Sequence, residues 1–173
     1  MAKVVGGLFS VEASGKFANA IIFDRRGYVR TYKRPTNPQT AAQGDVRQVL
    51  LATQRAIPVT GSITRTHVKT LAPVEYRWNA FLVQQVIGKG KVPWNVSLAA
   101  FDALPQAEQD EWTAEAAALG IVESHIPYAG NPPISAGAAL YILARTLHGL
   151  GIYVDTGAPD GSNAAAWAGN IIA

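Results

Sequence analysis

The 173-residue chain contains no cysteine, which excludes disulfide bonds, thiolate zinc sites and a cysteine nucleophile. It also lacks any uninterrupted apolar run of the roughly 18 residues that a membrane-spanning helix needs. Charged residues are few, at 16%, whereas hydrophobic residues make up 49% of the sequence. This composition excludes a wholly disordered chain and predicts about one ordinary domain with a hydrophobic core.

The sequence motifs of common enzyme classes are also missing. The three histidines do not have the HExxH spacing of a zinc site, and no serine lies within a GxSxG turn. The segment Gly88-Lys89-Gly90-Lys91 lacks the GxxxxGK[ST] spacing of a phosphate-binding loop and is better interpreted as a basic linker. We therefore expect no enzymatic activity, no metal and no cofactor.

Positive charge is scarce in the second half of the chain. Residues 92–173 contain one cation, Arg145, and eight of the twelve acidic residues, whereas residues 1–91 contain fourteen of the fifteen Lys and Arg. The two halves have formal charges of −7 and +10. Such segregation is typical of a basic surface that faces nucleic acid or an acidic protein. Opposite poles also allow copies to stack head-to-tail. The alternative is that the halves cover each other within one globule.

The N-terminal region, residues 1–36, has the pattern of a basic β-hairpin or small antiparallel sheet. Two runs rich in β-branched and aromatic residues, Phe17–Phe23 and Tyr28–Tyr32, flank the turn signal at residues 24–27. Cations at the tip and on the outgoing strand are candidate partner-binding residues. They are Arg25, Arg26, Arg30, Lys33 and Arg34. The interleaved tyrosines and cations can also stack bases and follow phosphates, and charges can simply protect an edge strand.

Residues 37–150 predict a helical region, a bundle of about four helices with a possible linker near residues 88–92. Apolar residues recur at the helical period in residues 38–56 and again after Pro73. A third helix is expected from Pro105 to Leu119, and a central one over Ala136–Leu147 with Ser135 as its N-cap. The Thr-rich stretch Ile57–Thr70 is interpreted as a linker or short strand pair. With the hairpin, these elements predict an α+β fold.

Two further segments, around Pro35–Thr40 and at the C-terminus, have patterns that predict a structural corner and a docking arm. Pro35, Asn37, Pro38 and Thr40 predict a rigid strand-to-helix corner, because proline fixes φ and Asn and Thr cap helices. Residues 151–173 predict a C-terminal extension, with a strand at Ile152–Val154 and an extended arm rich in Gly, Ala and Asn. Apolar residues in that arm are expected to dock on a neighbouring subunit; the alternative is that the tail packs on its own domain. They are Trp167, Ile171 and Ile172.

The basic region and the corner together carry a longer motif. Tyr28-Val29-Arg30 is followed by Pro35, Asn37, Pro38, Thr40, Gln43 and Arg47. This spacing resembles a YVRxxxxPxNPxTxxQxxxR signature shared by short, uncharacterised tailed-bacteriophage and prophage virion-associated proteins. The resemblance covers roughly residues 15–147. Later features of that group are matched by Trp78, Leu104, Trp112 and Ala116, and approximated by Ser135 with Gly137, from which an extra Ala136 separates it.

The resemblance implies a non-enzymatic, virion-associated protein. From it we expect a multi-copy structural protein of a bacteriophage particle, either a capsid-bound accessory (decoration) protein or a neck or tail component. Its expected partners are other virion proteins and copies of itself, with no membrane partner. Its expected location is the virion, assembled in the host cytoplasm. The alternative function is nucleic-acid binding by the basic N-terminal half.

Overall fold

The structure is a computed structural model that describes residues 15–17, 21–23, 29–31, 40–89, 93–123 and 133–173. The chain divides into two compact units, Met1–Pro38 and Gln39–Ala173, called here the N-terminal unit and the helical unit. The N-terminal unit contains strands β1 (Gly15–Phe17), β2 (Ile21–Phe23) and β3 (Val29–Thr31). They pair antiparallel in the order β1-β2-β3, with Ile22 opposite both Lys16 and Arg30.

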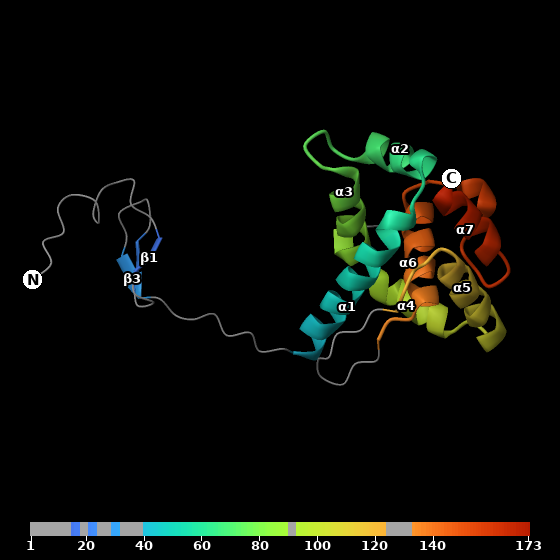
Figure 1. The fold of residues 1–173 in the computed structure, drawn as a ribbon, viewed down its shortest axis with the longest axis horizontal. Helices are drawn as coiled ribbons and strands as arrows, with labels where there is room; N and C mark the ends of the chain where they lie inside the picture. Colours follow the sequence, from blue (N-terminus) through green and yellow to red (C-terminus); the bar gives the residue numbers. More distant parts are fainter. Residues whose placement is uncertain (1–14, 18–20, 24–28, 32–39, 90–92, 124–132) are drawn as a thin grey trace, which may run out of the picture. The chain divides into compact units, whose positions relative to one another are not determined.

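The described part of the helical unit contains seven α-helices (Figure 1). They are α1 (Ala41–Ala56), α2 (Ser62–Leu71), α3 (Trp78–Gln84), α4 (Trp94–Asp102), α5 (Gln106–Ala118), α6 (Ala136–Gly149) and α7 (Ala164–Ile172). Shorter helical turns are η1 (Ile57–Val59), η2 (Gln85–Lys89) and η3 (Val154–Thr156).

The predicted α+β fold is therefore wrong. The described residues of the helical unit form helices and no strand, and six α-helices lie between residues 37 and 150, where about four were expected. In the N-terminal unit the described residues amount to three strands of three residues each, and the predicted turn at residues 24–27 lies outside them.

The main error lies at Ile57–Thr70, where Thr and Ile indicated a linker or strands. These residues form η1 and α2 instead, because α2 buries Thr64 and Val68 on one face. The Thr64 hydroxyl lies 2.8 Å from the Tyr153 hydroxyl and donates to the backbone oxygen of Asn170 at 2.9 Å. These tertiary contacts outweigh the modest helix propensity of β-branched residues.

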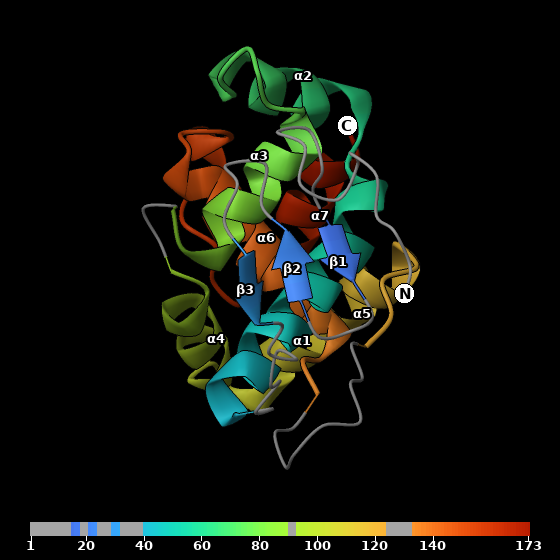
Figure 2. The same cartoon turned by 90° about the vertical axis from the view of Figure 1, so that its left-hand side faces the viewer.

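Helix α6 is the centre of the unit, as its uniformly apolar sequence predicted (Figure 2). Ten of its fourteen residues are buried, and it contacts α1, α4, α5, α7 and η2. The Ser135 hydroxyl accepts from the backbone N–H of Ala138 at 3.1 Å, so the predicted N-cap is confirmed. A Cβ atom at Gly137 would lie 2.5 Å from Thr113 Oγ1, which shows how closely α5 approaches α6.

The predicted C-terminal extended arm is also wrong. Residues 164–172 form α7, which packs against α2, α5 and α6. Trp167 and Ile171 are fully buried, together with Ala164 and Ala168, at the i, i+3, i+4, i+7 spacing of an amphipathic helix. At Ile152–Val154, expected to be a strand, Ile152 and Tyr153 form a bend and Val154 begins η3. The helical period of the apolar residues, and not the Gly/Asn content, determines this segment.

Helix α1 begins within the signature, directly after Thr40. Thr40 is its N-cap, and the Thr40 hydroxyl accepts from the backbone N–H of Gln43 at 3.4 Å. The T-x-x-Q part of the signature thus has the spacing of a capping box, in which the first residue caps the third helical N–H. The other predicted corner residues, Pro35, Asn37 and Pro38, lie outside the described residues.

Candidate interaction surfaces at the two ends of the helical unit

The connection between α2 and α3 forms a projecting turn at one end of the helical unit (Figure 1). The backbone N–H of Tyr76 donates to the oxygen of Pro73 at 2.8 Å, which closes a β-turn with Val74 and Glu75 at its centre. Val74 is fully exposed, at 108% of its reference area, and Leu71 and Tyr76 are exposed at 47% and 38%. Apolar residues gathered in this way are typical of an interaction site.

Two cations precede this turn on α2, and a third follows it. Arg65, Lys69 and Arg77 are exposed, and Glu75 is the acidic residue beside them. The Arg65 guanidinium lies 5.4 Å from the centroid of the Trp78 ring and donates to the backbone oxygen of Pro58 at 3.1 Å. Its position is therefore fixed by its own unit. We call Leu71, Val74 and Tyr76, with these three cations, the loop end.

The opposite end contains a cavity of about 330 Å³ between the first turns of α1 and α6 and helices α4 and α5. We call it the base cavity. Its apolar wall comes from one face of α4, where Trp94, Leu98 and Phe101 follow at the helical period. Asp45 of α1 and Asp102 of α4 contribute carboxylates. The remaining lining residues are Gln48, Gln109, Pro133, Ile134, Ser135 and Ala138.

The polar groups of the base cavity are held in place by their own helices. Gln109 Nε2 donates to the backbone oxygen of Leu104 at 2.8 Å, and the Ser135 hydroxyl caps α6. Phe101 packs on Tyr141 of α6 with 5.6 Å between ring centroids. Among the described residues that line the cavity there is no Lys or Arg. The site is thus pre-formed, apolar on one side and acidic.

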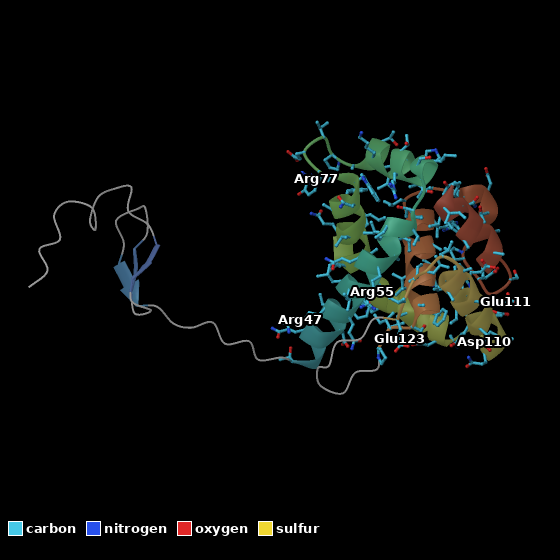
Figure 3. The ribbon with its side chains drawn as sticks, in the orientation of Figure 1. Arg47, Arg55, Arg77, Asp110, Glu111 and Glu123 are labelled. Carbon is cyan, nitrogen blue, oxygen red and sulfur yellow. The ribbon has the colours of Figure 1, made fainter. Side chains whose placement is uncertain are left out.

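The charge segregation of the sequence is also a segregation in space. Residues 40–84, which contain α1–α3, have five cations and two acids, whereas residues 94–118, which contain α4 and α5, have five acids and no cation. Figure 3 shows Arg47 and Arg77 on one side of the helical unit and Asp110 and Glu111 on the other. Within the helical unit, the cations of α1–α3 and the acids of α4 and α5 therefore lie on different sides.

A smaller cavity of about 260 Å³ lies between α2 and the turn that follows α6. Its wall includes His67 and Tyr153, whose φ of 56° is in the left-handed region that bulky residues rarely adopt. The Tyr153 ring lies edge-on to His67 and to Trp167, at 5.8 and 6.3 Å between centroids. With its hydroxyl beside Thr64, Tyr153 joins α2 to α7, so we interpret this strained turn as structural.

The predicted partner-binding residues fall into three groups. Arg25, Arg26, Lys33 and Arg34 lie outside the described residues, and Arg30 lies in β3. Trp167 and Ile171 are buried in the core of their own unit, which corrects the expectation that they contact a partner. Ile172 is half exposed, beside the start of α2.

The loop end and the base cavity were missed by the sequence interpretation. The helical period expected after Pro73 includes Val74, but the helix itself begins at Trp78 and Val74 lies in the turn before it. A helix that begins at Trp78 fits the sequence equally well and leaves Pro73–Tyr76 as a turn, so this alternative helix start could have indicated the loop end. The cavity joins residues of four helices and has no local signature.

The part of the chain that the structure describes contains no cluster of three or more potential metal ligands. Its helices are too short or too polar to cross a membrane. In comparisons with known proteins, no family model, curated protein or solved structure matches this chain.

Proposed function

We propose that this chain is a multi-copy structural protein of a bacteriophage particle, a capsid-bound accessory protein or a neck or tail component that acts through protein–protein interfaces. The observation that carries the proposal is the pairing of two unlike ends on one helical unit. One end has an apolar, cationic turn, and the other has a cavity with an apolar wall and carboxylates. Val74 at the turn and Asp102 at the cavity are exposed, so both ends present side chains to solvent.

The bacteriophage assignment is supported by the signature from Tyr28 to Arg47. In the described part of that signature, Thr40 and Gln43 form the N-terminal turn of α1. The signature therefore sets the start of the helical unit directly after a short basic region. This role of the motif is structural and fits a protein that binds other proteins of a particle.

Nucleic-acid binding is the second candidate, and one observation favours it. The N-terminal unit contains seven Lys and Arg against two acids, for a formal charge of +5, whereas the helical unit has −2. A basic unit of this kind can bind phosphates without reading sequence. The two candidates differ in their salt dependence, since phosphate binding releases counterions and weakens steeply as salt rises.

Two measurements test the proposed function. Density-gradient-purified particles from the strain that encodes the chain should contain its peptides in many copies, as measured by quantitative mass spectrometry. The purified chain should bind a fluorescent duplex of about 30 base pairs only weakly at about 150 mM salt, as measured by anisotropy. Absence from the particles, with tight duplex binding that falls steeply between about 50 and 200 mM salt, would instead establish the nucleic-acid function.

A further inference from the structure

We propose that the loop end of one copy docks into the base cavity of a second copy, so that copies assemble head-to-tail. This inference rests on the proposed function and names the surfaces that carry it. Val74 and Tyr76 pack against the part of the α4 wall formed by Trp94 and Leu98, and Arg77 pairs with Asp102.

The loop end is ready for docking before it meets a partner. The hydrogen bond from Tyr76 to Pro73 holds Val74 at the apex of the turn. Val74 is fully exposed, so its own unit provides no cover for it. A turn that is already ordered loses little conformational entropy on binding, which favours association.

The base cavity has the complementary size and chemistry. Its volume of about 330 Å³ falls within the range of ordinary binding pockets, roughly 300–1,000 Å³. Trp94 and Leu98 of α4 are half-buried and offer apolar contact to Val74 and Tyr76. The exposed carboxylate of Asp102 can pair with a cation from another copy. The described residues that line the cavity include no Lys or Arg. Complementary charge of this kind fixes register and rejects wrong partners.

The positions of the two surfaces determine the type of assembly. In Figures 1 and 2 the α2–α3 connection and the start of α1 lie at opposite ends of the helical unit. An interface between unlike surfaces is heterologous, so each copy that docks leaves one free turn and one free cavity. Such copies build a ring if the rotation between neighbours closes, and a continuous stack if it does not.

Charge exchange tests the pairing of Arg77 with Asp102 in the full chain. Arg77→Glu makes the turn acidic, and Asp102→Arg makes the cavity basic. Sedimentation velocity over a concentration series should show self-association of the wild type, weakened at least about tenfold in either variant alone. An equimolar mixture of the two variants should regain association, because the acidic turn of one fits the basic cavity of the other. The double variant should regain it as well.

Apolar contact is tested separately. Val74→Ser should weaken association about tenfold or more, whereas Val122→Ser, at another exposed valine, should not. Glu111→Arg is the matched charge control for Asp102→Arg, since both are exposed acids on neighbouring helices. Thermal melts by circular dichroism should show all variants folded, because exposed charges contribute little to stability.

The outcomes separate this inference from the proposed function. If the wild type associates and the charge variants associate equally well, alone or mixed, the docking is wrong and the structural role stands. If the wild type stays monomeric at every concentration but occurs in particles, the docking is also wrong, and the base cavity serves another virion protein. Absence from the particles overturns the proposed function itself.

Discussion

Gly61 lies against the backbone carbonyl of Ile172, with no room for a Cβ atom between them. Its N–H donates to the oxygen of Ile171 at 2.7 Å, and the N–H of Ile63 donates to the oxygen of Ala173 at 3.0 Å. The first N–H groups of α2 thus receive partners from the last carbonyls of α7, in place of a side-chain cap.

This close approach predicts a strong effect of a single methyl group. Gly61→Ala should lower the free energy of unfolding by about 1–3 kcal/mol, because the backbone of α7 must move to make space. Gly169→Ala is the matched control, since Gly169 lies in α7 and a Cβ atom added there would meet no other atom within 4 Å. It should raise stability by about 0.5–1 kcal/mol through helix propensity. Urea titrations measure both changes, and a harmless Gly61→Ala would contradict the packing of α7 on α2.

Two buried tryptophans should respond differently to the same substitution. Trp112 Nε1 donates to the backbone oxygen of Asp160 at 2.7 Å, whereas Trp167 Nε1 has no hydrogen-bond partner among the described residues. Trp112→Phe should therefore destabilise more than Trp167→Phe by about 1 kcal/mol, because only the first loses a hydrogen bond. Equal losses, or the reverse order, would show that Trp167 Nε1 is bonded in solution. Chemical denaturation of the two variants under identical conditions measures the difference.

The C-terminal helix should be required for folding. Trp167→Ala removes a fully buried side chain and should cost about 3–5 kcal/mol. Deletion of residues 157–173 should leave the helical unit unfolded or only partly folded, as measured by near-ultraviolet circular dichroism and limited proteolysis. A stable, protease-resistant truncated chain would restore the interpretation of this segment as an arm.

The signature should contribute to stability through its cap. Thr40→Ala should lower the free energy of unfolding by about 1 kcal/mol, because the N–H of Gln43 loses its acceptor. Thr40→Ser keeps the hydroxyl and should lose much less. If both variants melt at the wild-type temperature, the T-x-x-Q spacing has a role other than capping α1.

The elements that the sequence predicted correctly are those with local signals. Pro105 and Ser135 mark the starts of α5 and α6, and both helices end within two residues of their predicted ends. The central position of α6 followed from its apolar residues alone. These signals depend on neighbours within one or two helical turns, so a single sequence contains them in full.

The elements that the sequence did not predict depend on distant residues. Helix α2 is stabilised by Tyr153 and by the end of α7, which lie far along the chain from it. Composition indicated an arm at residues 157–173, although Trp167 and Ile171 have the helical period that buries α7. The candidate surfaces are harder still, because the base cavity joins four helices and the loop end depends on where α3 begins.

The fastening of α7 onto α2 also has a consequence for biosynthesis. A ribosome completes Ser62–Leu71 long before it reaches Ile171 and Ala173, so α2 emerges without the carbonyls that later accept from the N–H groups at its start. Contacts of such long sequence separation slow folding, because a large loop must close before they form. We therefore expect α2 and the neighbouring loop end to be the last part of the helical unit to become ordered. The docking turn of a chain would then reach its final form only after the base cavity of the same chain.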